Sequence, residues 1–388
     1  MLKNSKIIKL FICFFALLII NSFFIFRNPW VDWDIVSYIG NVKYIENKNI
    51  EIIHKETYNE LREYLDQKRY DIIKQANQYR KDIFKDKEAF YDIMPFYNIK
   101  FIYIYSIYFL SKTGLSIINS ILAISIFSYL IFSSILFFVF KKEIEKQTLL
   151  FFPLYLLTFS SPIIIAARST TPDMFGAMLL FLGVFLVLKK QLIGGIAILI
   201  FSLGVRTDNI IFIGVLLFYL KAFGYNEYKI NFKTFFIGSI LTIGFYKGIN
   251  SYFDNFGYWK LYYNSFIKAI PYPSSFEAII TLREYLSIFK EKIALLLGLR
   301  DNKPITFFPF YIILAMITFI LAMKNKVKLN NIYVGLLLIS TFTLIFKFAI
   351  FPNIQERYFI SYFIIIFISL LKIAFNEENN DGRRRLKI

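Results

Sequence analysis

Apolar blocks long enough to cross a lipid bilayer recur along this chain, and they constrain its fold more than any other feature. A transmembrane helix needs about 20 predominantly apolar residues. The first such block, Ile7 to Phe26, follows Lys3 and Lys6. It is longer than the apolar core of a signal peptide and lacks a small-residue cleavage site, so we expect a retained span. The hydrophobic fraction of 57%, against about 45–50% in soluble domains, indicates a multi-pass membrane protein.

The scarcity of cysteine and histidine excludes several kinds of site. A single cysteine, Cys13, excludes a disulfide within the chain, and we expect it to be a small apolar residue of the first span. A single histidine, His54, excludes histidine-rich metal sites and any triad with more than one histidine, and we expect it on the surface of a polar loop.

The net charge of +18 would suggest nucleic-acid binding in a soluble protein. Here the basic residues cluster in short loops between apolar blocks, which is where the positive-inside rule puts them. We therefore expect membrane lipids as partners and no nucleic acid.

The basic clusters also predict the orientation of the spans. Lys3, Lys6 and Lys9 place the N-terminus in the cytoplasm, and the basic tail, residues 376–388, places the C-terminus there as well. We predict an all-α polytopic fold: one transmembrane domain, residues 1–388, with about ten apolar helices. The expected helices cover residues 7–26, 115–140, 149–166, 174–188, 192–204, 210–220, 235–253, 305–323, 332–351 and 358–375.

Two long segments are expected outside the cell: a first extracytoplasmic loop, residues 27–98, and a second, residues 254–304. In the first, apolar residues from Tyr58 to Ile73 recur at helical spacing between charged ones, which predicts amphipathic helices. Such helices either lie on the membrane surface or pack on the outer ends of the spans. The apolar block 101–110 is too short to span, so we expect it at the surface or partly inserted.

Two short apolar blocks, 192–204 and 210–220, are separated by Arg206 and Asp208. Lysines flank the pair on both sides, so two short helices that turn back are the simplest interpretation. A single broken span is the alternative, and it would reverse every later loop.

Charged residues at span ends are informative because burying them costs several kcal/mol. Asp32 and Asp34 follow the first span directly, beside Trp30 and Trp33. A carboxylate held there can serve as a general base or a metal ligand, and the sequence leaves open which of the two aspartates does so. An aromatic belt at the membrane interface accounts equally well for the tryptophans.

Arg168 and Asp173 bracket the outer loop between the third and fourth expected helices. Pro172 and Asp173 suit a helix start, so capping is the alternative to a functional role for Asp173. Arg168 has no capping role, and its alternative is snorkelling to the interface.

Arg206 and Asp208 lie deep in the membrane, where they either pair with each other or face a polar cavity. Arg357 and Tyr358 open the last span on the outer side; a guanidinium there can clamp a phosphate, and snorkelling is again the alternative. Together, the acids and arginines gather mostly on the outer side. That arrangement suits a site that handles a lipid phosphate and activates a hydroxyl.

In their order and sidedness, these residues resemble the GT-C superfamily of polyprenyl-phosphate-sugar-dependent glycosyltransferases, which includes protein O-mannosyltransferases and the lipid A aminoarabinose transferase. The resemblance covers roughly residues 7–375. Its short motifs are Asp34-x-x-x-Tyr38, Pro95-Phe96-Tyr97, Arg168 with Pro172-Asp173, Arg206-x-Asp208 and Arg357-Tyr358. The chain departs from the family at Ile35, where many members have a second acid, and at Arg206-Thr207-Asp208, which is often Arg-Pro-Glu.

The resemblance implies transfer of a sugar from a polyprenyl-phosphate donor to a hydroxyl of a glycan, lipid or protein, with inversion, at the extracytoplasmic face of the cell (inner) membrane. It implies that Asp34 and Asp173 are catalytic, and that they would be the ligands of a divalent cation, Mg²⁺ or Mn²⁺. The implied substrate-binding residues are Tyr38, Arg168, Arg206, Asp208, Arg357 and Tyr358.

Other classes of protein stay open. A flippase or transporter usually shows paired repeats and charges along a path through the membrane, whereas this chain has no internal repeat. A lipid-linked glycan polymerase uses similar substrates but would lack the acid directly after the first span. A non-catalytic assembly subunit is the remaining alternative.

Overall fold

The computed structural model describes residues 2–299, 307–324 and 326–385. Within these ranges every regular element is a helix, apart from an isolated bridge between Trp30 and Ser169. The all-α prediction is therefore confirmed. Two predicted segments fall partly outside the described residues: the end of the second loop with the start of the next helix, at 300–306, and the end of the basic tail, at 386–388.

The chain divides into two compact units, and each has its own helices. Unit 1 comprises Met1–Met178, Gly204–Thr207 and Lys247–Thr281, and unit 2 comprises Leu179–Leu203, Asp208–Tyr246 and Leu282–Ile388. Helices α13 (Asp173–Leu188) and α16 (Phe232–Tyr252) contribute residues to both units.

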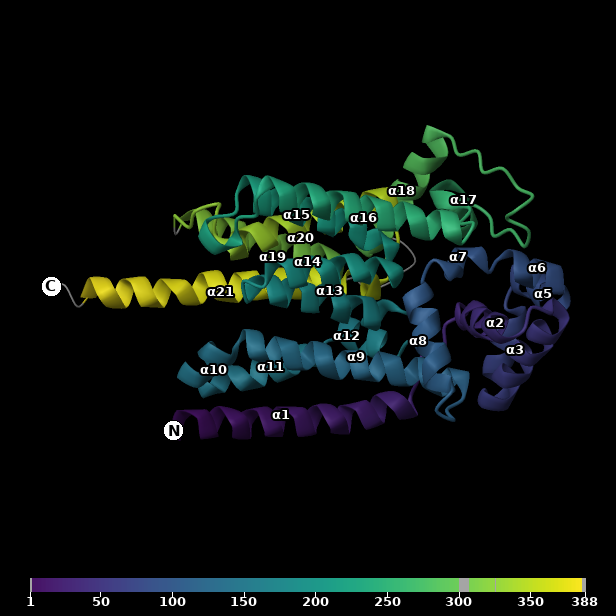
Figure 1. Cartoon of the computed structure of the whole chain (residues 1–388), viewed down its shortest axis with the longest axis horizontal. Helices are drawn as coiled ribbons and strands as arrows, with labels where there is room; N and C mark the ends of the chain where they lie inside the picture. Colours follow the sequence, from purple (N-terminus) through teal and green to yellow (C-terminus); the bar gives the residue numbers. More distant parts are fainter. Residues whose placement is uncertain (1, 300–306, 325, 386–388) are drawn as a thin grey trace. The chain divides into compact units, whose positions relative to one another are not determined.

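Two long apolar helices of unit 1, α1 (Leu2–Arg27) and α9 (Ile117–Val139), pack against each other (Figure 1). Next to α9 lies a bent pair, α11 (Phe151–Thr158) and α12 (Ser161–Arg168), whose axes differ by 51°. The sequence predicted one continuous span here. The break has a local cause, because Pro162 has no N–H to continue the hydrogen-bond ladder from the end of α11.

The predicted first outer loop folds into short helices that gather beyond the C-terminal end of α1 (Figure 1). They are α2 (Ile35–Glu46), α3 (Ile50–Tyr64), α4 (Gln67–Gln75), α5 (Gln78–Lys85), α6 (Lys87–Asp92) and α7 (Pro95–Asn98). Helices α3 to α6 each begin at an Asn or Asp whose side chain accepts a hydrogen bond from a first-turn N–H. The apolar residues Leu61 and Ile73 are buried, as the pattern predicted. They lie on two separate helices, however, because a new helix begins after the cap at Asp66.

Helix α8 (Phe101–Ser111) follows the segment Lys87–Asn98 after a bend of 108°. Part of the predicted second loop packs on the first loop within unit 1. It contains α17 (Gly257–Phe266) and a strap in which the Ser274 backbone N–H donates to Asp92 at 2.9 Å. The remaining helices of unit 1 are α10 (Lys141–Lys146) and η1 (Thr148–Leu150).

Unit 2 is built around α20 (Ile332–Ile350), which packs on α15 (Ile210–Ala222), α19 (Phe307–Lys324) and α21 (Ile360–Arg385) (Figure 1). Gly335 permits the closest contact, because a Cβ there would lie 2.0 Å from the Tyr219 ring. The other elements named in this part of the chain are α14 (Leu192–Phe201), η2 (Ser202–Gly204), η3 (Thr207–Asn209), η4 (Asn226–Tyr228), α18 (Leu282–Leu296) and η5 (Glu356–Phe359).

Five helices among the described residues are long and apolar enough to cross a membrane, and up to seven spans result if each bent pair counts as one. The five cover Ser5–Arg27, Ile117–Val139, Phe307–Lys324, Ile332–Ile350 and Glu356–Ala374. The chain is thus an all-α protein whose apolar helices suit a membrane. The predicted number of ten and the direction of each span stay predictions.

Candidate functional site

Asp34 occupies the N-cap position of α2, yet its side chain makes no capping hydrogen bond. Its backbone is already helical, and the carboxylate instead accepts a hydrogen bond of 3.0 Å from the hydroxyl of Tyr97, in α7. Asp32 behaves differently, because its carboxylate turns back to accept the backbone N–H of Asp34 at 3.3 Å. The two aspartates that the sequence could not separate therefore have different surroundings.

Backbone pairing joins the start of the first loop to the loop after α12. The Trp30 N–H donates to the Arg168 carbonyl at 2.9 Å, and the Thr170 N–H donates back to the Trp30 carbonyl at 3.1 Å. The Asp32 N–H then donates to the Thr170 hydroxyl at 3.0 Å. Two segments that were singled out separately in the sequence thus lie together in unit 1.

Asp173 begins α13 and is buried, with a relative exposure of 2%. Its carboxylate accepts a hydrogen bond of 2.7 Å from the Thr171 hydroxyl and forms an ion pair with Arg206. The stem of Arg206 lies against Gly176, where a Cβ would come within 2.8 Å of it. The glycine one turn into α13 thus leaves space for the arginine that binds the aspartate.

Three tyrosines, of which Tyr38 and Tyr103 are fully buried and Tyr97 is partly buried, form a ladder beside these carboxylates. The ring of Tyr38 lies edge-on to Tyr97 at 5.5 Å and to Tyr103 at 5.2 Å. The Lys100 ammonium donates to the Tyr38 hydroxyl at 2.7 Å. Burial, and next the charge of Asp34, raise the pKa of Tyr38 well above its usual value, so this hydroxyl stays protonated. We call Asp34, Asp173, Tyr38, Tyr97 and Tyr103 the Asp34 cluster.

A cation that the sequence analysis missed lies near the same aspartates. The Arg80 guanidinium lies over the Trp33 ring at 5.7 Å and donates to the Ile72 carbonyl at 2.9 Å. Burial lowers the pKa of Arg80, and the charges of Asp32 and Asp34 oppose that shift. Nothing in the sequence distinguished Arg80, or Lys100, from the other charged residues of the loop.

Arg168 has a structural partner. Its Nε donates to the Asn28 carbonyl at 2.5 Å, which ties the end of α12 to the residue after α1. This hydrogen bond holds the loop before Asp173 in place.

In unit 2, Asp208 forms an ion pair of 2.5 Å with Lys347 in the last turn of α20. Lys347 is 7% exposed, and its ammonium lies 4.9 Å from the centre of the Tyr362 ring. The Tyr362 hydroxyl donates to Asn209 at 3.3 Å, and Asn209 donates to Ser202 at 3.0 Å. We call these five residues the Lys347 network, and in a span such a buried charge is by default a functional candidate.

Arg357 and Tyr358 lie in η5, directly before α21. Arg357 is 6% exposed, and its guanidinium lies over the Tyr358 ring at 5.4 Å. A snorkelling arginine would extend its head towards water, so this burial disfavours snorkelling, and the phosphate-clamping role stays a prediction. The neighbouring Glu356 accepts the Phe307 backbone N–H at 2.7 Å.

Within the described residues, no group of three or more His, Cys, Asp or Glu side chains could hold a metal ion. Asp34 and Asp173, the predicted ligands, accept hydrogen bonds from Tyr97 and from Thr171 and Arg206. A Mg²⁺ ion held by one or two carboxylates and a substrate phosphate needs fewer protein ligands. A divalent cation therefore stays a prediction, and no step proposed below depends on it.

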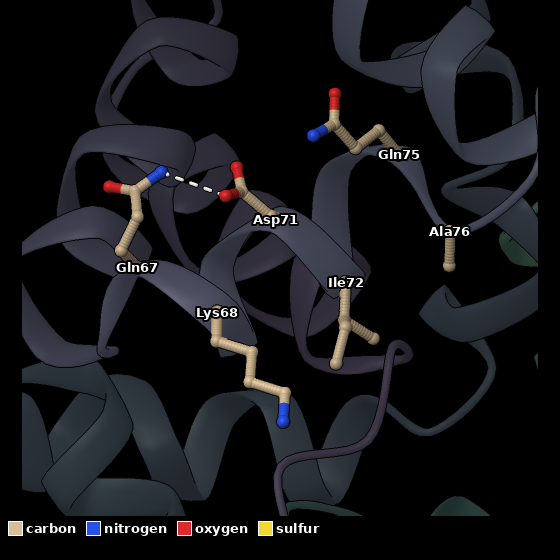
Figure 2. Close-up of a pocket in the computed structure, with 6 residues that line it drawn as sticks. All are labelled: Gln67, Lys68, Asp71, Ile72, Gln75 and Ala76. Carbon is tan, nitrogen blue, oxygen red and sulfur yellow. Dashed lines mark hydrogen bonds between the residues drawn. The ribbon is translucent and has the colours of Figure 1, made fainter.

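An open hollow of about 630 Å³ runs along one side of α4 (Figure 2). Its lining residues are Gln67, Lys68, Asp71, Ile72, Gln75 and Ala76. In Figure 2 the Gln67 amide donates to Asp71, at 3.0 Å, as expected for residues one helical turn apart. None of the predicted site residues lines this hollow, so we give it no role.

The predicted site residues therefore fall into two groups, one in each unit. Unit 1 holds Asp34, Tyr38, Arg168, Asp173 and Arg206, and unit 2 holds Asp208, Arg357 and Tyr358. Their roles stay predictions. Comparisons with protein-family models, curated proteins and solved structures give no match for this chain.

Proposed function

We propose that this chain is a membrane glycosyltransferase of the GT-C type. It moves a sugar from a polyprenyl-phosphate donor to an acceptor hydroxyl, with inversion at the anomeric carbon. The acceptor belongs to a glycan, a lipid or a protein. In this proposal Asp34 is the general base, and Asp173 supports it from the same unit.

The observation that carries the proposal is the hydrogen bonding of the Asp34 carboxylate. An aspartate at a helix N-cap normally accepts a first-turn N–H, and this bond contributes about 1 kcal/mol. The Asp34 side chain makes no such capping bond, and its carboxylate instead accepts a hydrogen bond from the Tyr97 hydroxyl. The carboxylate of Asp32, two residues earlier, accepts the backbone N–H of Asp34 in a local turn. A carboxylate that is positioned by a buried hydroxyl and not used for capping suits a group that accepts a proton.

The proposed step balances without a general acid. The acceptor oxygen attacks the anomeric carbon while its proton passes to Asp34, and the bond from that carbon to the phosphate oxygen breaks. The electron pair stays on the departing polyprenyl phosphate, which needs no proton to leave. Nearby cations stabilise the charge that develops on the phosphate. Arg206 and Lys100, which belong to the same unit as Asp34, are the candidates.

We place the enzyme in the cell (inner) membrane with about ten apolar helices and both termini in the cytoplasm. The positive-inside rule supports this orientation, because the basic clusters flank the loops assigned to the inner side. The Asp34 cluster then belongs to the extracytoplasmic face, where polyprenyl-linked sugars are used.

A transporter or flippase is the second candidate, and one observation favours it. The buried Lys347 forms an ion pair with Asp208 at the end of an apolar helix, and such pairs often lie along ion or substrate pathways. A lipid-linked glycan polymerase stays the third candidate. Transfer of many sugars to one acceptor, seen as a ladder of products, would favour it over single transfer.

The test compares Asp34→Asn with Asp32→Asn in purified protein given radiolabelled polyprenyl-phosphate sugars and lipid, glycan and protein acceptors. We expect Asp34→Asn to lower transfer about 10²–10⁴-fold, the usual effect of losing a general base. Asp32→Asn is the matched control and should keep most of the activity. Wild-type-like transfer by Asp34→Asn would overturn the assignment of the base. Solute movement across vesicles without sugar transfer by the wild type would favour the transporter.

A further inference from the structure

Tyr103 carries a buried hydroxyl that the protein itself does not satisfy. The residue lies in α8 and is fully buried, with a relative exposure of 0%. Among the described residues, its hydroxyl has no hydrogen-bond partner. Leaving a buried hydroxyl unpaired costs free energy, so such a group calls for an explanation.

The surroundings of Tyr103 place it at the Asp34 cluster. Its ring lies edge-on to Tyr38 at 5.2 Å and 6.4 Å from Phe175, two residues after Asp173. Asp173 and Asp34 are also the two charged groups whose fields act on its hydroxyl. The other two tyrosines of the ladder are engaged, Tyr97 with Asp34 and Tyr38 with Lys100. Tyr103 differs from them in having no such bond.

Two further buried polar atoms without a hydrogen-bond partner among the described residues lie on residues next to Asp34 in the chain. They are the indole Nε1 of Trp33 and the hydroxyl of Ser37, one turn into α2. Ser37 adjoins Tyr38, which contacts Tyr103. Two more unsatisfied donors therefore lie within three residues of Asp34 in the chain.

The chemistry of these groups indicates what would satisfy them. Hydroxyl and indole groups donate hydrogen bonds, and the carboxylates accept them. A ligand that both donates and accepts, without a negative charge of its own, fits this combination. Sugar hydroxyls have that character.

We infer that the Tyr103 hydroxyl hydrogen-bonds to a hydroxyl group of a sugar bound at the Asp34 cluster. This inference rests on the proposed function and adds a substrate-binding residue that no sequence motif indicated. The sugar belongs either to the donor or to the acceptor. The two sources share the same chemistry, and the kinetic test below separates them.

The first measurement is thermal unfolding of the substrate-free protein. Tyr103→Phe removes a hydroxyl that has no partner, so the unfolding midpoint should stay the same or rise. Tyr105→Phe, on the same helix with a relative exposure of 42%, is the matched control. A midpoint several degrees lower in Tyr103→Phe alone would show that the hydroxyl has a structural partner, and would overturn the inference.

The second measurement is transfer from radiolabelled decaprenyl-phosphate pentoses and hexoses. We expect Tyr103→Phe to lower kcat/KM about 10- to 100-fold, while Tyr105→Phe matches the wild type. A higher KM for the donor alone assigns the bond to the donor sugar, and a higher KM for the acceptor alone assigns it to the acceptor. If the wild type is active and Tyr103→Phe is equally active, the inference fails and the proposed function stands. If the wild type transfers none of these sugars, both fail.

Discussion

The Asp34 cluster of unit 1 and the Lys347 network of unit 2 each bury a charged side chain, but the buried charges have opposite signs: Asp173 is 2% exposed and Lys347 is 7% exposed. In the Asp34 cluster, neutral hydroxyls contribute: Tyr97 donates to Asp34, and Thr171 joins Arg206 at Asp173. In the Lys347 network, the buried ammonium pairs with Asp208 and also donates to the Tyr362 hydroxyl at 3.4 Å. Each site thus contains an ion pair and hydroxyl groups, but the first surrounds a buried carboxylate with donors, whereas the second surrounds a buried ammonium with acceptors.

The two sites also differ in how the chain builds them. The residues of the Asp34 cluster lie at or near the starts of four helices, α2, α7, α8 and α13. An apolar helix, α20, carries Lys347 in its last turn. Chemistry with a substrate is easier to accommodate where neutral donors can exchange partners. An ion pair with a buried member holds together the two segments that carry its residues, and removing one of the two charges leaves the other uncompensated.

The largest effect we predict tests the ion pair. Asp208→Asn takes a carboxylate partner away from an ammonium that is 7% exposed. Breaking a fully buried pair costs about 3–5 kcal/mol, and we expect the lower end of that range because the Tyr362 hydroxyl still accepts from the ammonium. Lys347→Met should cost less, because the Asp208 side chain is 35% exposed and can be hydrated. Thermal unfolding of the detergent-solubilised variants measures both.

The double variant Asp208→Asn with Lys347→Met supplies the control, since it leaves neither charge. It should recover much of the stability that Asp208→Asn loses. Equal stability of all three variants and the wild type would remove the contrast between the two sites.

Much of the helical architecture could be predicted, because apolar blocks and basic flanks are strong local signals. The prediction for residues 332–351 agrees closely with α20, Ile332–Ile350. The expected span at 149–166 was wrong in one respect, because it is bent at Pro162 into α11 and α12. The amphipathic pattern after Tyr58 likewise gave no sign that a new helix begins after the cap at Asp66. Hydropathy averages over such single-residue breaks.

The partners within the candidate site were much harder to predict. Arg206 lies two residues from Asp208, and the sequence suggested that the two could pair. The structure pairs Arg206 with Asp173 and Asp208 with Lys347, 33 and 139 residues away in the chain, respectively. Tyr103 gave no signal at all, because a tyrosine in an aromatic run is indistinguishable from its neighbours until the fold buries it. Long-range pairing is decided by packing, which no local pattern encodes.

A smaller effect tests whether tight packing of short helices holds unit 1 together. A Cβ at Gly40, in α2, would lie 2.6 Å from the Phe90 ring. Gly40→Ala should therefore cost about 1–3 kcal/mol of stability through overpacking. Gly214→Ala, in α15 of unit 2, is the matched control, because a Cβ there meets nothing within 4 Å. If Gly40→Ala unfolds at the same temperature as Gly214→Ala, packing at Phe90 is not a constraint.

The smallest effect concerns His54, which was expected on a loop surface but lies partly buried against the same Phe90, with ring centres 5.2 Å apart. Burial lowers the pKa of His54 below its usual value near 6.5, against the opposing hydrogen bond to the Ile83 carbonyl. The folded state therefore binds a proton less readily than the unfolded state. The stability contributed by neutral His54 is complete above about pH 6.5 and is lost as the pH falls through the lower pKa of the folded state.

We expect the unfolding midpoint of the wild type to fall between pH 7 and pH 5 by more than that of His54→Gln. Carboxylates whose lowered pKa does not involve His54, such as Asp71 beside Lys74 and Gln67, contribute equally to both proteins and cancel in the comparison. Such a difference would show that protonation of His54 destabilises the short helices of unit 1 at acidic pH. Identical pH profiles would instead mean that His54 is hydrated in solution, and that the aromatic contacts around Phe90 are looser than the packing at Gly40 requires.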